Sequence, residues 1–199
     1  MENLCRSEGI VLQTMDFQDY DQILTVYSLE EGLIKLIQKQ ARRQNHKKGS
    51  ATALTHAEFV YAKGSSELFR CQEISLLNAY LSLRASLHVM RASCEIVDAV
   101  KQSQMLHQPS PILYQLLLLY LEKLPSMKNP YALSASFLLK VLRHEGICDL
   151  ETLLEKVDET EFPSIHTLAF SKTFVALDQC PFSDPLHQQI TQFFLEQIQ

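Results

Sequence analysis

Residues 9–37 read GIVLQTMDFQDYDQILTVYSLEEGLIKLI and contain three short runs rich in Ile, Val, Leu and Thr. The runs cover residues 9–14, 22–28 and 33–37, and this composition is typical of β-strands. Turn-forming residues, including Glu-Glu-Gly at 30–32, separate them. The stretch therefore predicts three consecutive strands joined by short turns.

Two further runs of the same composition, residues 53–61 and 67–71, follow after a longer insertion. Five short strands at this spacing predict a small closed or partly closed barrel. We therefore expect an OB-fold barrel over residues 1–79.

Beyond residue 80 the apolar residues recur at intervals of three and four, which is the spacing of an amphipathic helix. Three helix starts place an N-cap residue directly before a proline, at Ser110-Pro111, Asn129-Pro130 and Asp184-Pro185. Residues 80–199 are thus expected to form an all-helical domain, and the fold class is α+β.

Two of the expected helices stand out. Residues 112–124 are apolar nearly all round, which predicts the central helix of a bundle. Residues 131–145 end at Gly146, a residue suited to a helix C-cap. Further helices are expected at 150–157, around 165–177 and at 186–198.

The composition excludes several classes of protein. Hydrophobic residues make up 46% of the chain and charged residues 21%, so a folded core is expected. No apolar run approaches the roughly 20 residues of a membrane span, and the N-terminus lacks the pattern of a signal peptide, which predicts a cytoplasmic protein. The five cysteines are widely spaced, which predicts reduced thiols and no zinc site.

No catalytic pattern rises above background. A phosphate-cradling loop needs clustered glycines, and none occur together. Asp16, Asp19 and Asp21 lack the spacing of a calcium loop and are expected to lie in a solvated turn. Cys148 with His144 or His166 could be drawn as a nucleophile and base, but chance pairs of this kind are common. We therefore expect no enzyme and no cofactor.

The charge pattern is the one feature that points to a ligand. Residues 35–48 hold six cations and no acid, whereas ten acids follow residue 143. The candidate nucleic-acid-binding residues are Lys35, Lys39, Arg42, Arg43, Lys47 and Lys48. Cations in a loop of such a barrel can neutralise phosphates, although a merely solvated loop is the alternative. Tyr27, Phe59 and Tyr61 would either stack on bases or fill the barrel core.

Several motifs in order resemble the bacterial RecO family. The N-terminal ones are Ile10-Val-Leu-Gln-Thr14, Phe17-Gln-Asp-Tyr-Asp21 and the strand that runs from Ile23 to Gly32, followed by Lys39-Gln-Ala-Arg-Arg43. Phe137 to Gly146 resembles a family helix of the second half. Asp19 stands where the family usually has Glu, and Gln40 stands in place of a Gly. The four-cysteine zinc site of many members is absent, and the chain is shorter than typical members.

This resemblance implies a non-enzymatic mediator of DNA repair and recombination. Its expected ligands are single- and double-stranded DNA, its expected partners are the single-stranded-DNA-binding protein and RecR, and it would help to load RecA and anneal complementary strands. Lys140, Arg143 and Phe137 are the candidates for receiving the acidic tail of the single-strand binder, although a solvated helix face explains the two cations equally well. A protein–protein adaptor with no DNA role is the alternative function.

Overall fold

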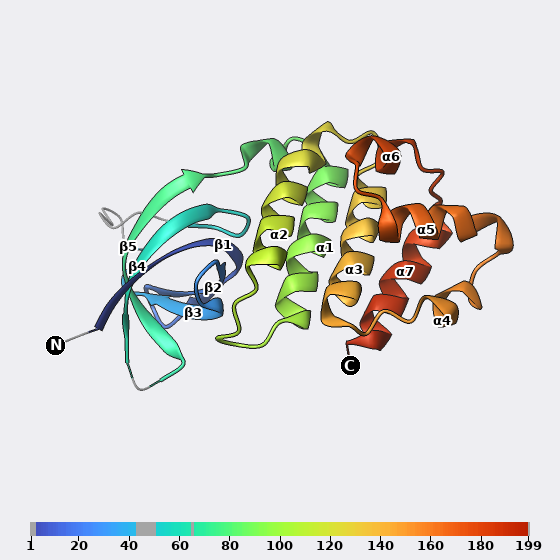
Figure 1. Ribbon diagram of the computed structural model, residues 1–199. Coiled ribbons are helices and arrows are strands. Elements are labelled where there is room, and N and C mark those ends of the chain that lie inside the picture. The colour runs from blue at the N-terminus through green and yellow to red at the C-terminus, as the bar shows by residue number, and fades with distance from the viewer. Residues whose placement is uncertain (1–2, 43–50, 65, 199) are drawn as a thin grey trace. The chain divides into compact units, whose positions relative to one another are not determined.

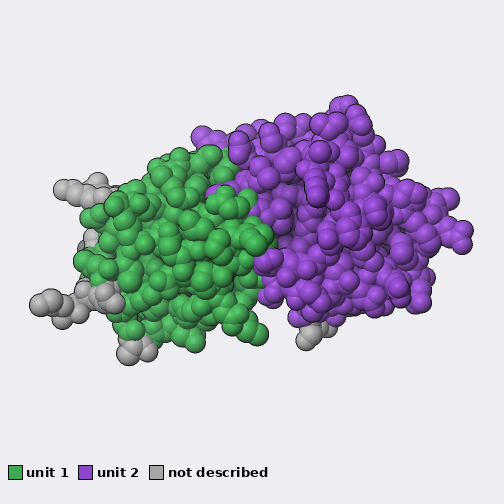
Figure 2. Space-filling model, in the orientation of Figure 1, with its two compact units in different colours: residues 1–80, 104–115 green, residues 81–103, 116–199 purple. Residues whose placement is uncertain are grey.

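The computed structural model describes residues 3–42, 51–64 and 66–198 of the chain (Figure 1). These residues form two compact units, coloured separately in Figure 2. Unit 1 contains Met1–Tyr80 and Gln104–Gln115, and unit 2 contains Leu81–Ser103 and Leu116–Gln199. Unit 1 therefore draws on two separate segments of the sequence.

Five strands of unit 1 form a closed barrel. They are β1 (Asn3–Phe17), β2 (Asp21–Ser28), β3 (Gly32–Gln38), β4 (His56–Lys63) and β5 (Leu68–Asn78). Their order around the barrel is β1-β2-β3-β5-β4; β3 and β5 pair in parallel and the other pairs are antiparallel. This mixed five-stranded barrel confirms the fold predicted for the N-terminal part of the chain.

The barrel core is built from the inward-facing residues of all five strands. Leu24 and Val26 on β2, and Ile34 and Leu36 on β3, are fully buried and lie two residues apart on their strands, so each pair faces the same side. Phe59 and Tyr61 belong to the same core and have no exposed surface. These two aromatic residues are therefore core residues and offer no stacking surface for bases.

Residues 104–115 pack against the rest of unit 1. The backbone N–H of His107 donates to the carbonyl oxygen of Leu33 at 3.0 Å. Gly32 has a φ of +69° and lies against the backbone of Gln108. A Cβ added to Gly32 would be 2.2 Å from the Gln108 carbonyl oxygen. Tyr27 is also fully buried, and its ring lies 6.3 Å from that of Tyr114. Of the two alternatives for Tyr27, stacking on bases or filling the core, the structure therefore shows a buried residue.

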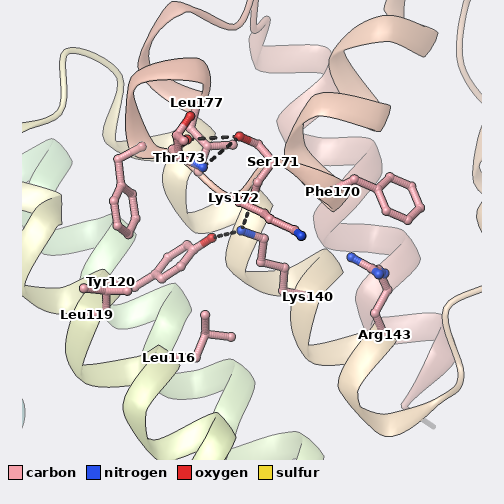
Figure 3. Close-up of a pocket in the computed structure, with 11 residues that line it drawn as sticks. Leu116, Leu119, Tyr120, Lys140, Arg143, Phe170, Ser171, Lys172, Thr173 and Leu177 are labelled. Carbon is pink, nitrogen blue, oxygen red and sulfur yellow. Dashed lines mark hydrogen bonds between the residues drawn. The ribbon is translucent and has the colours of Figure 1, made fainter.

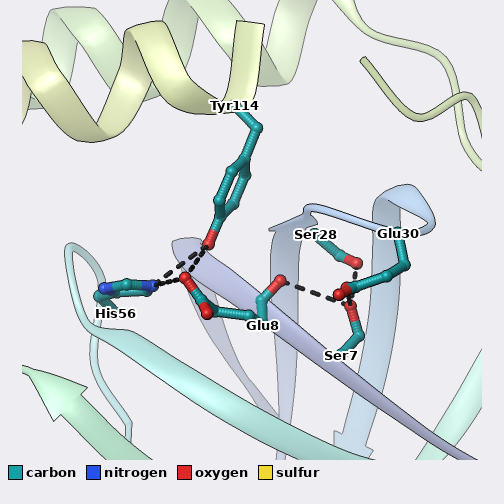
Figure 4. Close-up of polar contacts among 6 residues, drawn as sticks. All are labelled: Ser7, Glu8, Ser28, Glu30, His56 and Tyr114. Atoms are coloured by element: carbon teal, nitrogen blue, oxygen red, sulfur yellow. Dashed lines mark hydrogen bonds and ion pairs between the residues drawn. The ribbon is translucent and has the colours of Figure 1, made fainter. Parts of the chain in front are cut away.

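A polar contact fixes the end of the same segment. Figure 4 shows Tyr114 pointing at Glu8 on β1 and His56 on β4. The Tyr114 hydroxyl donates to Glu8 Oε1 at 3.2 Å, and His56 Nε2 lies 2.8 Å from the same oxygen. Burial and the Glu8 carboxylate raise the pKa of Tyr114, so this hydroxyl keeps its proton and remains a donor.

The second half of the chain is helical, as predicted. Its elements are the 3₁₀ turn Leu81–Arg84, α1 (Leu87–Ser103), α2 (Pro111–Lys123), the 3₁₀ turn Leu124–Ser126, α3 (Pro130–Glu145), α4 (Leu150–Leu154), the 3₁₀ turn Glu159–Glu161, α5 (Phe162–Phe170), α6 (Phe174–Gln179) and α7 (Asp184–Gln197). The first five residues of α2 belong to unit 1. No helix among the described residues is long and apolar enough to cross a membrane.

The central helix of unit 2 is α3, which corrects the expectation that residues 112–124 would hold this place. Eleven of the sixteen residues of α3 are buried, and the helix packs on α1, α5, α6 and α7. By contrast, Ile112 and Leu119 of α2 are 75% and 44% exposed. The proportion of apolar residues in a helix therefore did not predict how deeply the helix is buried. In α3, small Ala and Ser residues occupy faces that other helices approach closely.

Candidate functional site

A row of outward-facing side chains crosses three neighbouring strands and continues onto β5. Gln13 on β1 pairs with Thr25 on β2, Thr25 with Lys35 on β3, and Lys35 with Leu68 on β5. These four residues line a groove of about 490 Å³ together with Met15, Ile23, Ser66 and Glu67. The β2–β3 face and the loops beside it are where OB-fold barrels bind oligonucleotides.

Lys35 stands in the middle of this groove. Its side chain is exposed, and it has no ion pair or hydrogen bond to any of the described residues. Its ammonium group is therefore available to a phosphate. Met15, Ile23 and Leu68 are the apolar residues among the eight that line the groove, and none of the eight is aromatic.

Lys39, which follows β3, is held by a buried acid. Its Nζ lies 2.6 Å from Asp21 Oδ2, and the backbone N–H of Gln40 donates to Asp21 Oδ1 at 2.9 Å. The Lys39 ammonium and this N–H hold the pKa of Asp21 below its usual value. The pair ties the end of β3 to the start of β2, so Lys39 has a structural role in the barrel.

Arg42 is also engaged, at the turn between β1 and β2. Its Nη1 lies 2.7 Å from Asp16 Oδ2, and its Nη2 donates to the carbonyl oxygens of Gln18 and Asp19 at 2.9 and 2.8 Å. Asp16 and Asp19 are exposed, as expected of a solvated turn, although Asp16 also pairs with Arg42. For Asp21 the expectation is wrong, because this residue is buried and paired with Lys39. The other predicted DNA-binding residues, Arg43, Lys47 and Lys48, lie outside the described residues.

Unit 2 carries a second cavity, of about 390 Å³ (Figure 3). Leu116, Leu119 and Tyr120 of α2 line one side, and Lys140 and Arg143 of α3 lie opposite. The segment from Phe170 to Phe174 completes the wall together with Leu177. An apolar hollow with several cations at its edge suits a ligand that combines an apolar group with a carboxylate.

The two cations of α3 are fixed in different ways. Lys140 Nζ donates to the Tyr120 hydroxyl at 2.7 Å and to the carbonyl oxygen of Ser171 at 2.8 Å. Arg143 donates to the carbonyl oxygen of Ala169 at 2.6 Å, and its guanidinium lies over the Phe170 ring, 4.2 Å from the centroid. Burial, and secondarily the charge of Arg143, lowers the pKa of Lys140 to about 8.

Phe137 differs from the two cations with which it was grouped. It is fully buried and packs its ring 5.3 Å from that of Tyr120, and it does not line the cavity. Phe170 and Lys172, which do line it, were not identified from the sequence. They stand at the break between α5 and α6, in a stretch where the sequence predicted one helix around residues 165–177.

The remaining reactive groups form no further site. All five cysteines are free thiols. Within residues 3–42, 51–64 and 66–198, no three His, Cys, Asp or Glu side chains are arranged to hold a metal ion. That the protein folds without zinc stays a prediction, which elemental analysis of the purified protein would test.

Comparisons with known proteins agree with this arrangement. Residues 1–80 match the family model described as "Recombination protein O N terminal". The chain is 27% identical over 143 residues to the DNA repair protein RecO of Chlamydia pneumoniae, a match that covers 71% of this chain and 56% of the relative. It is 24% identical over 184 residues to the DNA repair protein RecO of Acetivibrio thermocellus, covering 92% of this chain and 72% of the relative.

The matches extend beyond the barrel into the helical part of the chain. The DNA repair protein RecO of Caldicellulosiruptor saccharolyticus is 23% identical over 176 residues, which is 88% of this chain and 71% of the relative. The chain covers less than two thirds of the Chlamydia pneumoniae relative. With a matching N-terminal domain and similarity that continues through most of the helices, the chain is similar to the RecO family over most of its length.

Proposed function

We propose that this protein is a non-enzymatic mediator of DNA repair and recombination that binds single- and double-stranded DNA through its barrel. The observation that carries the proposal is the groove on the outward face of β1, β2 and β3, which Lys35 lines without an ion pair to any of the described residues. In the sequence, Lys35 opens the basic segment 35–48. Cations in this position neutralise phosphates without reading the base sequence.

The lining of the groove supports a role in annealing complementary strands. Stacking on aromatic side chains stabilises bound bases by about 1–3 kcal/mol per base. The groove has aliphatic and polar residues in place of aromatic ones, so it would hold the strand mainly by its backbone. Bases held in this way keep their pairing edges free for a second strand. Help in loading RecA and cooperation with RecR are proposed from the similarity to the RecO family.

Charge reversal in the basic segment tests DNA binding. We would change Lys35, Arg43, Lys47 and Lys48 to Glu and leave Arg42 intact, because Arg42 holds the β1–β2 turn. The expected result is weaker binding of a labelled oligonucleotide for all sequences alike. The log–log salt slope should also fall by roughly 0.7 for each phosphate of a single strand that the variant no longer neutralises.

A matched control places the same kind of change in unit 2. Arg91, Lys123 and Lys128 are exposed, and replacing them by Glu should leave the salt slope nearly unchanged. Equal loss of affinity in both variants would show a general charge effect. A folded barrel variant with unchanged affinity and slope would contradict the proposal.

We also propose that the cavity of unit 2 receives the acidic tail of the single-stranded-DNA-binding protein. The convergence of Lys140, Arg143 and Lys172 on an apolar hollow favours this role over that of a solvated helix face. Exchanging Lys140 and Arg143 for Glu should slow association with a tail peptide and leave binding of naked oligonucleotide intact. If the protein binds the tail peptide but no oligonucleotide, it is a protein–protein adaptor, which is the alternative function.

A further inference from the structure

The guanidinium of Arg42 is organised around a single anionic oxygen. Two carbonyl oxygens of the β1–β2 turn, those of Gln18 and Asp19, accept from Nη2, and the backbone N–H of Arg42 donates to the carbonyl oxygen of Tyr20 at 3.1 Å. These hydrogen bonds hold the side chain and its backbone without any help from Asp16. A second nitrogen, Nη1, donates to Asp16 Oδ2 at 2.7 Å.

The two ion pairs of the basic segment differ in how easily they can open. The side chain of Asp21, the partner of Lys39, is 10% exposed, whereas the side chain of Asp16 is 62% exposed. An exposed pair contributes little to stability because water and salt compete with it. Asp16 can therefore turn to solvent at little cost, while Asp21 cannot.

The pair lies at the β1–β2 turn, at the end of the strands that carry the proposed DNA groove. Asp16 pairs with Gln22 across β1 and β2, next to the Met15–Ile23 pair that lines the groove, but its side chain leaves β1 on the opposite face from Met15 because successive residues of a strand alternate. A DNA strand that leaves the groove around the end of β1 and β2 would bring a phosphate within reach of Arg42. Phosphate and carboxylate oxygens suit the planar fork of an arginine equally well.

We propose that Arg42 is a phosphodiester site that Asp16 occupies in the free protein, and that a phosphate of bound DNA replaces Asp16 there. The inference rests on the proposed DNA binding and adds its regulation. The Asp16 carboxylate competes with the backbone of the ligand, so it lowers the affinity of the site and speeds release. A protein that binds DNA strands briefly and then releases them to pair benefits from such a competitor.

The test is the substitution Asp16→Asn, measured by binding of a labelled oligothymidylate at low salt. Its control is Asp19→Asn, which removes the same charge from the same turn. Asp19 meets Arg42 through its backbone carbonyl, so its carboxylate is not the group that holds the guanidinium. We expect Asp16→Asn to bind the oligonucleotide roughly 2- to 5-fold more tightly than Asp19→Asn, the size of effect an exposed ion pair produces.

Comparing Asp16→Asn with Asp19→Asn again in an Arg42→Gln background completes a double-mutant cycle. There the difference between Asp16→Asn and Asp19→Asn should vanish. If Arg42→Gln fails to fold, the ¹⁵N and ¹³C signals of the Arg42 guanidinium in the wild-type chain serve instead, since they should shift when oligothymidylate is added.

The outcomes separate this inference from the proposed function. Wild-type protein that binds oligothymidylate, with Asp16→Asn no tighter than Asp19→Asn, would overturn the phosphate site alone. Guanidinium signals of Arg42 that stay in place during saturating binding would do the same. Failure of the wild-type chain to bind any oligonucleotide would overturn both.

Discussion

Lys140 carries a charge that depends on pH near neutrality. Burial lowers its pKa to about 8, so the ammonium is fully charged well below that pH and progressively neutral above it. An acidic peptide prefers the charged form, and its affinity should fall as the pH rises through 8. The decrease between pH 7 and pH 9 should reach up to about tenfold if only the charged form binds.

The control for this pH dependence is Lys140→Arg, which stays charged throughout the range and should remove the step. Titration of a tail peptide by fluorescence anisotropy across a pH range from about 6.5 to 9.5 measures both curves. The free energy of unfolding depends on pH in the opposite direction and rises between pH 8 and 10.5. In this range Lys140 holds its proton in the unfolded state but has lost it in the folded state. Wild-type affinity that does not change with pH would exclude Lys140 as a binding residue for the tail.

Gly32 of the barrel has no room for a side chain. Its φ of +69° favours glycine, and a Cβ would meet the carbonyl group of Gln108 at 2.2–2.4 Å. Gly32→Ala should therefore lower the free energy of unfolding by more than about 1 kcal/mol. Gly64→Ala is the control, since a Cβ there meets nothing within 4 Å and the change should be neutral or slightly stabilising. Urea unfolding of the two variants gives the comparison.

Individual residues also show what the sequence alone can reveal. Gly32 was predicted as a turn residue, but its closeness to Gln108 depends on a segment far along the chain. Asp16 and Asp21 gave no sign of their partners, because Arg42 and Lys39 reach them only after three strands have paired. Local pattern identifies the turn, and tertiary structure decides what the turn binds.

Among the elements, the helix ends were the best predicted. Asn129 caps α3 and accepts hydrogen bonds from the N–H groups of Tyr131 and Ala132, and Gly146 ends the helix in the left-handed conformation. The cap of α7 differs by one position, because Ser183, and not Asp184, accepts from Leu186. Caps depend on a few adjacent residues, so they can be read locally.

The strands were predicted in number and order but not in length. β1 extends over fifteen residues and β5 over eleven, well beyond the runs 9–14 and 67–71. The extra residues of β1 pair with β4, and those of β5 pair with β4 along its other edge. Their polar composition carries no strand signal, because pairing to a neighbour extends a strand irrespective of β-propensity.

The cap of α3 offers a test at the level of one element. Asn129→Ala should destabilise the protein by about 1 kcal/mol, because two backbone N–H groups lose their acceptor at the start of the most buried helix. Asn129→Asp keeps an acceptor and should retain nearly full stability. Chemical denaturation followed by circular dichroism distinguishes them, and equal stability of Asn129→Ala and wild type would show that the cap is dispensable.

On the scale of the whole molecule, the two proposed ligand sites belong to different compact units. We expect their binding energies to be independent, because the two sites share no lining residue and sites without shared partners usually combine additively. A saturating tail peptide should change the oligonucleotide affinity less than about twofold. Isothermal titration with and without peptide measures this, and a large change would reveal coupling between the sites.

The assembly of unit 1 has a consequence for the nascent chain. At 5–20 residues per second, the ribosome needs roughly 2–7 s to add the 35 residues between position 80 and position 115. During that interval all five strands have been made, yet the segment that covers Tyr27 and bonds to Leu33 has not. Until that segment is made, the Tyr27 ring and the Leu33 carbonyl oxygen lack these contacts. The order of synthesis therefore leaves this protein a short period in which chaperones and proteases can compete for it.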